Sequence, residues 1–132
     1  MAKKLSRDAI LSIDDIQTEE VFVPEWGGSV LVRGMVGHER DAFEATLLKQ
    51  RGKQQEMDLT DVRAKLAARS IVDEAGALVF TLEDVAALSK KSGAALQRIF
   101  NVAQRLSGLS DDDIEELAKN FVSDLKEDST SS

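Results

Sequence analysis

His38 is the only histidine in the 132 residues, and it is the first side chain to test for catalysis. A serine nucleophile would need it as a general base, itself oriented by a carboxylate. The sequence contains no G-x-S-x-G motif, and His38 follows Gly37 at the start of a predicted helix, where an exposed polar residue is ordinary. The absence of cysteine excludes a thiolate nucleophile and thiolate metal ligands. We therefore predict no catalytic residue and no enzyme activity.

A run of acidic residues from Asp111 to Glu116 is the only cluster that suggests a metal ion. A calcium loop needs alternating ligands, a central glycine and a distal glutamate, and this run lacks that spacing. Its position after Ser110 is instead typical of the first turn of a helix, where the macrodipole favours negative charge. Gly27 and Gly28 match neither phosphate-binding glycine motif. No metal ion and no cofactor are predicted.

Residues 20–35 predict a β-hairpin that holds the only tryptophan and the only proline. Strands are expected over residues 20–25 and 29–35, since Val-Phe-Val favours a pleated surface and Gly27-Gly28 supplies a turn. Trp26 falls at the tip. Two interpretations of it remain open: a lid over the core, or an anchor in an interface with a partner.

The rest of the chain is predicted to be mainly helical. A polar connector over 51–56 is expected to be a flexible loop, and 71–80 a small hairpin or extended excursion. Helices are predicted over 38–50, 59–70, 82–90, 92–106 and 110–125. A capping box at Thr81 and Asp84, an N-cap at Ser92 and a C-terminal glycine at Gly108 mark the expected ends of two of these helices. The last helix has a clean apolar stripe, which either packs on the core or binds a partner. Its candidate partner-binding residues are Ile114, Leu117, Phe121 and Leu125.

The predicted fold class is mainly α (α+β), with an N-terminal β-hairpin packed on a bundle of about four to five helices. Residues 1–18 are expected to form a partly ordered arm, 19–125 a single domain, and 126–132 a disordered acidic and serine-rich tail.

The net charge of −7 is concentrated near the C-terminus. Residues 1–106 carry 15 Lys and Arg against 16 Asp and Glu, whereas 107–132 carry two against eight. Such a surface disfavours nucleic-acid binding. No apolar run is long enough to span a membrane, and the first residues lack the apolar stretch of a signal peptide, so a cytoplasmic protein is expected.

Several segments, in order, resemble one known family. The chain is similar to the tail assembly chaperones of long-tailed, siphovirus-type bacteriophages and prophages over roughly residues 20–122. The segments that carry the resemblance are VPEWGGSV at 23–30, GHERDAFE at 37–44, IVDEAG at 71–76, FT at 80–81, LQRIFNVAQRLSGLS at 96–110 and EELAKNF at 115–121.

This resemblance implies a chaperone without catalytic residues. Such a protein binds the tape measure protein, keeps it soluble, promotes assembly of the tail tube, and is absent from the mature virion. The resemblance thus implies the tape measure protein and the tail tube protein as partners, and the host bacterial cytoplasm as location. A further copy of the chain is another candidate partner.

Two other classes of protein remain open. A small DNA-binding phage regulator would need a basic recognition helix, and Arg63, Lys65 and Arg69 mark the nearest candidate. A structural component of the tail is the other alternative.

Overall fold

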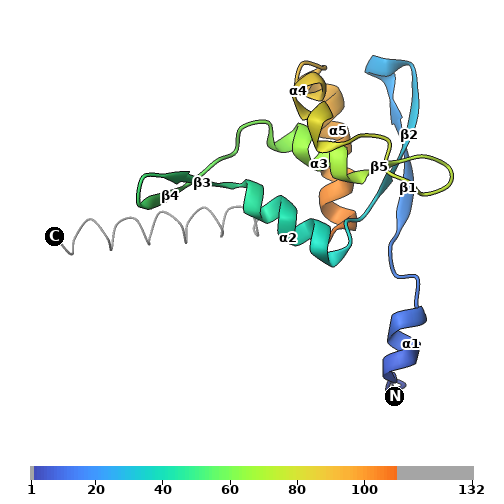
Figure 1. Cartoon of the computed structure of the whole chain (residues 1–132). Helices are drawn as coiled ribbons and strands as arrows, with labels where there is room; N and C mark the ends of the chain where they lie inside the picture. Colours follow the sequence, from blue (N-terminus) through green and yellow to red (C-terminus); the bar gives the residue numbers. More distant parts are fainter. Residues whose placement is uncertain (1, 110–132) are drawn as a thin grey trace.

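The computed structural model describes residues 2–109. Within this range a three-stranded antiparallel sheet leads into a helical body, and a small second hairpin projects from it (Figure 1). The prediction of a mainly α fold that begins with a β-hairpin is confirmed. The predicted helix from Ser110 lies outside the described residues. The elements are α1 (Arg7–Ser12), β1 (Thr18–Val23), β2 (Gly28–Arg33), α2 (Gly37–Thr46), β3 (Leu48–Arg51), β4 (Gln54–Met57), α3 (Val62–Ser70), β5 (Ile71–Val72), α4 (Val85–Leu88) and α5 (Gly93–Leu106).

The hairpin of β1 and β2 packs one face on the helices. Alternation along the strands puts Val21, Val23 and Val32 on the inner face, where all three are buried. Its turn differs slightly from the prediction: residues 24–26 form a 3-10 turn, and Gly27 alone adopts the left-handed conformation, with φ of 69°. Gly28 already belongs to β2.

The predicted excursion over 71–80 contributes a third strand to this sheet. In β5, Ile71 lies opposite Val32 and Val72 opposite Leu31. Both β5 residues are buried. Burying their apolar side chains in the sheet is more favourable in free energy than exposing them to water in a loop. The chain then turns back, and Leu78 forms a bridge with Val72.

Residues 48–57 correct two predictions. The first predicted helix ends at Thr46 instead of Gln50, and the polar connector is a hairpin of β3 and β4 with Gly52 in its turn. Gly52 has φ of 63°, a conformation that a two-residue hairpin turn requires. Polar strands show no alternation of apolar and polar residues, so the sequence carried no strand signal here.

Helix α5 is the centre of the core. Ser92 caps its N-terminus through the amide of Ala95, as predicted. Gly108 is left-handed, with φ of 73°, and its amide bonds to the Arg105 carbonyl while that of Leu109 bonds to Gln104. This is a Schellman ending, which satisfies two otherwise orphaned carbonyl groups. The buried face of α5 comprises Ala95, Leu96, Ile99, Phe100 and Ala103.

The chain between β5 and α5 is less regular than predicted. The capping box at Thr81 and Asp84 is present, but it opens a 3-10 turn over Leu82–Asp84 followed by the short helix α4. The predicted helix over 82–90 is therefore a 3-10 turn plus four α-helical residues. Leu88, the buried residue of α4, packs with Ala64 and Ala68 of α3.

The end of β2 meets the C-terminal end of α5 in a tight contact, which we call the hairpin base. It comprises Gly34, Met35, Leu106 and Ser107. A Cβ atom at Gly34 would collide with the Leu106 carbonyl oxygen. The Met35 amide donates a buried hydrogen bond of 2.9 Å to the Ser107 hydroxyl. Only glycine therefore allows this approach of backbone to helix.

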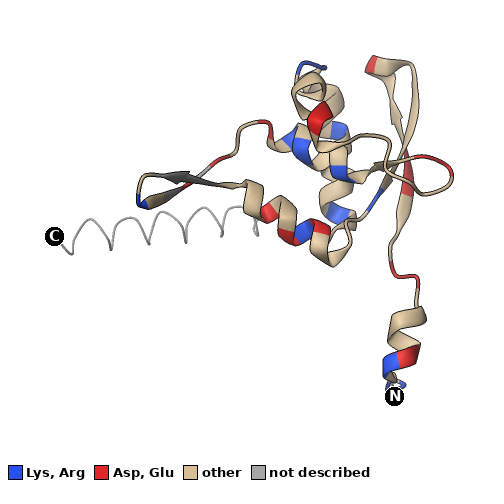
Figure 2. Ribbon diagram, in the orientation of Figure 1, with Lys and Arg blue, Asp and Glu red and all other residues tan. Residues whose placement is uncertain are grey.

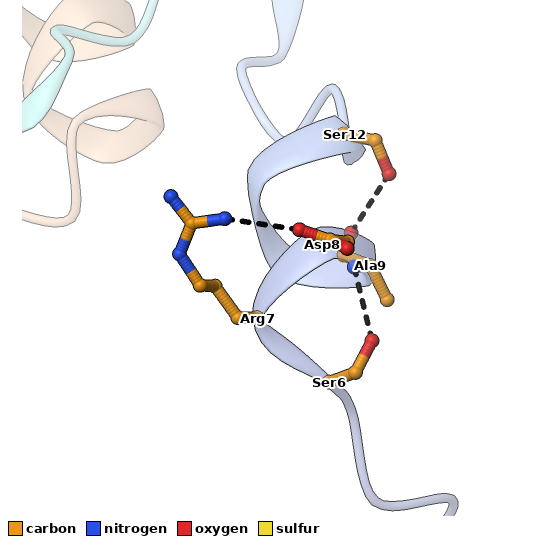
Figure 3. Close-up of polar contacts among 5 residues, drawn as sticks. All are labelled: Ser6, Arg7, Asp8, Ala9 and Ser12. Atoms are coloured by element: carbon orange, nitrogen blue, oxygen red, sulfur yellow. Dashed lines mark hydrogen bonds and ion pairs between the residues drawn. The ribbon is translucent and has the colours of Figure 1, made fainter.

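Helix α1 lies beyond β1, at the end of the hairpin opposite the tip (Figure 1). Ser6 accepts a hydrogen bond from the Ala9 amide at 3.2 Å, and the Ser12 hydroxyl donates to the Ala9 carbonyl at 3.1 Å (Figure 3). Arg7 pairs with Asp8 in the same turn. None of the residues of α1 is buried. The division into arm, domain and tail stays a prediction.

Candidate partner-binding groove

Trp26 ends the 3-10 turn at the hairpin tip. Pro24 is at the first position of this turn, where its fixed φ suits a helical start and its missing N–H costs nothing. Trp26 is 36% exposed, so its ring is neither a buried core residue nor free in solvent. It lies at the border of two adjoining hollows, and Phe80 borders both of them.

The first hollow, which we call the tip pocket, has a volume of about 330 Å³. Its walls are mostly apolar, and it lies between the hairpin tip and α4. Asp84 and Lys91 supply the charged groups of its lining. A pocket of this size and polarity suits a large apolar side chain. The lining residues are Trp26, Phe80, Asp84, Ala87, Leu88 and Lys91.

The second hollow, the edge groove, has a volume of about 630 Å³ and follows the edge of β2. Ser29, Val30 and Leu31 line one side of it, and Val79 and Phe80 lie in the segment that returns from β5. Its charged lining residues are all acidic: Glu20, Asp73 and Glu74. Figure 2 shows the acidic residues of the loop after β5.

Two ion pairs attach the hairpin to α5. Arg98 bonds both carboxylate oxygens of Glu25 at 3.1 Å, and Arg105 bonds those of Glu19 at 2.9 and 2.8 Å. The two arginines are seven residues apart and so lie on one face of α5. Glu25 immediately precedes Trp26, so the first pair fixes the tip next to the tryptophan.

The Glu25 carboxyl has a lowered pKa. A backbone hydrogen bond to the carboxylate is the largest cause, desolvation opposes it, and the Arg98 guanidinium lowers the pKa further. Glu25 is therefore ionised at neutral pH and available to Arg98.

Comparison with known proteins decides the family. A family model described as phage tail assembly chaperone matches residues 6–120. The chain belongs to the phage tail assembly chaperone family. A search of curated proteins finds no match. Among solved structures, the tail assembly chaperone of bacteriophage HK97 matches with a TM-score of 0.56 and 18% identity, covering 76% of this chain and 89% of that one. At this identity the structural match supports the fold, while the family model establishes the membership.

The chaperone family and fold imply a non-catalytic role. His38 is exposed near the start of α2. Among residues 2–109, no group of three or more His, Asp or Glu side chains could hold a metal ion, and no helix is both long and apolar enough to cross a membrane.

Of the predicted partner-binding residues, the structure places Trp26 beside both hollows. The other four, Ile114, Leu117, Phe121 and Leu125, lie outside the described residues, as does the acidic run from Asp111.

Sequence reasoning missed Phe80, Leu88 and Lys91 of this chaperone's tip pocket. They are 54 or more residues from Trp26 along the chain, and the tertiary fold, in which β5 pairs with β2 and α4 packs on α3, brings them near it. A usable signal was present: Leu78, Val79 and Phe80 form an apolar run just before the capping box at Thr81.

Proposed function

We propose that this chaperone binds the tape measure protein of its phage, keeps that long apolar chain soluble, and promotes assembly of the tail tube around it. The observation that carries the proposal is the family match over residues 6–120. The groove adds physical support, because a chaperone must leave apolar surface accessible to a client.

Apolar side chains in and beside the walls of the two hollows are exposed. Val79, in the lining of the edge groove, is 51% exposed, and Leu82, which in the sequence lies between Phe80 and Asp84 of the tip pocket, is 58% exposed. Isolated apolar residues on a surface need no explanation, but apolar residues beside an open groove are typical of an interaction site. The chain's charge of −7 keeps such a surface soluble by mutual repulsion.

The direct test is co-expression with the tape measure protein encoded by the same phage. We expect the soluble fraction of the tape measure protein to rise at least several-fold with the chaperone, and both proteins to co-purify. An insoluble client in the presence of abundant, folded chaperone would contradict the proposal.

The predicted last helix is a second candidate contact with the client. Its stripe motivates a double variant, Leu117→Ser with Phe121→Ser, and a control on the polar side, Glu116→Ser with Lys119→Ser. We expect the first to reduce client solubility and the second to preserve it. Unchanged client solubility with a folded stripe variant would exclude this contact.

A DNA-binding role receives less support from α3. Arg63 lies over the Phe100 ring at 6.0 Å and bonds Gln97, and the Lys65 ammonium donates to the Thr46 carbonyl. Two of the three basic side chains of this helix, Arg63 and Lys65, thus already have partners within the protein, whereas a recognition helix must present such groups to the phosphates and bases. A gel shift at moderate salt should show no complex.

The proposed role also places the protein in the host cytoplasm and outside the finished particle. Mass spectrometry of purified virions should detect the tail tube protein and the tape measure protein without this chain. Its presence in stoichiometric amounts would favour a structural tail component instead.

A further inference from the structure

Strand β2 is paired unequally on its two sides. On one side β1 covers it completely, from Gly28 to Arg33. On the other side β5 pairs only with Leu31 and Val32. Within residues 2–109, the part of β2 nearest the tip therefore has an open edge, and the edge groove is lined by it.

The hydrogen-bonding direction along β2 identifies the open groups. Residues of an antiparallel strand direct their N–H and C=O groups alternately to either side. The Gly34 amide bonds the Gln17 carbonyl, so residues 28, 30 and 32 face β1. Ser29 and Leu31 face the other way; Leu31 meets Val72, whereas the N–H and C=O of Ser29 face the groove without a partner in residues 2–109.

The edge groove, of about 630 Å³, leaves space beside this edge. Ser29 is exposed, and a Cβ atom added at Gly28 would have no neighbour within 4 Å, so the tip end of β2 is uncovered by the other described residues. At the tip end, the edge groove adjoins the tip pocket through their shared walls, Trp26 and Phe80. An added strand could thus place one apolar side chain in the tip pocket.

The charges of the groove favour a basic occupant. Asp73 is occupied locally, because its carboxylate accepts the amides of Ala75 and Ala77. Glu20 and Glu74 are exposed, and neither forms an ion pair within the described part of the chain. Among the described residues that line the edge groove there is no Lys or Arg.

We propose that this edge binds an extended client segment of alternating apolar and basic residues, which adds to the sheet as a strand beside β2. The residue opposite Ser29 shares the outer face with Glu20, so a basic side chain fits there. Its two neighbours point to the inner face, toward Trp26 and Phe80, and are apolar. The assignment of this segment to the tape measure protein rests on the proposed function. Its alternating apolar and basic chemistry follows from the groove alone.

A defined peptide tests the chemistry directly. The probe is a blocked seven-residue peptide in which lysine and leucine alternate, and binding to the full chain is measured by isothermal titration calorimetry. One control peptide has glutamate in place of lysine. The other carries an N-methyl group on every lysine, which removes the N–H groups that would face Ser29. We expect each control to bind about tenfold or more weakly than the probe.

Variants of the protein test the site. Ser29→Pro removes the edge-facing N–H without removing a bond to β1, and we expect about fivefold weaker probe binding than for Ser29→Ala. Glu20→Lys with Glu74→Lys, the groove charge reversal, should weaken binding about tenfold. Asp41→Lys with Glu83→Lys is the matched control, because it makes the same change in net charge on exposed residues outside both hollows.

The outcomes separate this inference from the proposed function. Loss of probe binding and of client solubility in the folded groove variants, but not in the charge control, supports it. A probe that fails to bind the wild type, binds equally well when N-methylated, or binds the groove charge reversal as well as its matched control overturns it, even if the wild type solubilises the client. If proline at position 29 prevents folding, the N-methylated peptide and the groove charge reversal still decide the matter.

Discussion

The two ends of the β1–β2 hairpin differ in how closely they pack against the rest of the protein. At the base, Gly34 lies against the Leu106 carbonyl and the Met35 amide is bound by Ser107. Beside it, Arg33 bonds both oxygens of Glu39 at 2.8 Å, with side chains only 15% and 16% exposed. At the tip, Trp26 is one-third exposed between two hollows, and the strand edge at Ser29 has no partner among residues 2–109.

We therefore propose that the base of the hairpin is structural and that its tip binds a partner. The base fixes the position of the sheet on α5 through contacts that tolerate no added atom. The tip carries the Glu25–Arg98 ion pair, which is half exposed on the arginine side and so contributes little stability. Substitutions at the base should therefore change folding, and those at the tip should change binding.

The largest effect is expected for Gly34→Ala. The added methyl group meets backbone, which cannot move away as a side chain could, and overpacking of this kind costs about 3 kcal/mol in the free energy of unfolding. Gly28→Ala, in open space at the tip end of β2, should change it by less than about 0.5 kcal/mol. Urea denaturation of both variants measures the contrast, and equal losses would remove the distinction between the two ends.

Removal of the Ser107 hydroxyl should have the next largest effect. Ser107→Ala leaves the buried Met35 amide without its acceptor, at a cost of about 2 kcal/mol. The corresponding change near the tip, Ser29→Ala, removes an exposed hydroxyl and should be close to neutral. Thermal unfolding followed by circular dichroism is sufficient; a stable Ser107→Ala variant would mean that another group satisfies the amide.

Trp26→Ala should weaken client binding more than it lowers stability, unlike the two substitutions at the base. Because the ring is only partly buried, we expect about 1 kcal/mol lower stability, yet about tenfold weaker binding to the client. Phe22→Ala is the matched control, since Phe22 is exposed on the outer face of β1 and lines neither hollow. Client binding that is unchanged by Trp26→Ala would leave the lid interpretation as the better one.

The smallest effect concerns pH. Because the pKa of Glu25 is lowered from 4.5 in the folded protein, its ionised form stabilises the fold above that pH, and the contribution is lost as pH falls through the lowered value. Glu25→Gln should melt slightly below the wild type at pH 7, and the gap should close in acid. Glu83→Gln serves as the control. If the difference in melting temperature widened in acid, the pKa of Glu25 would not be lowered in the folded protein.

Local signals in the sequence predicted local structure well, and long-range pairing poorly. The Ser92 cap and the left-handed Gly108 each depend on residues within a turn or two, and both were predicted correctly. The pairing of β5 with β2 joins residues about 40 apart, and no pattern in Ile71-Val72 specifies that partner. The β3–β4 hairpin was missed because its strands are polar, so no apolar face marked them.

The candidate site shows the same division. The sequence Pro24 to Gly27 predicted a turn with a tryptophan at the hairpin tip, and the structure has Trp26 at that position. Whether the ring meets solvent or core depends on Phe80 and Leu88, which reach it only through the tertiary fold. The choice between lid and anchor could not be made from the residues around Trp26 alone.

Trp26 has one more consequence, which is spectroscopic. The chain has one tryptophan and no tyrosine, so ultraviolet emission excited at the indole band comes from the hairpin tip alone. A partly exposed indole shifts its emission to the blue when a ligand covers it and to the red when the chain unfolds. The protein thus carries a built-in optical reporter at the mouth of the groove, and titrations can be followed there without attaching a dye.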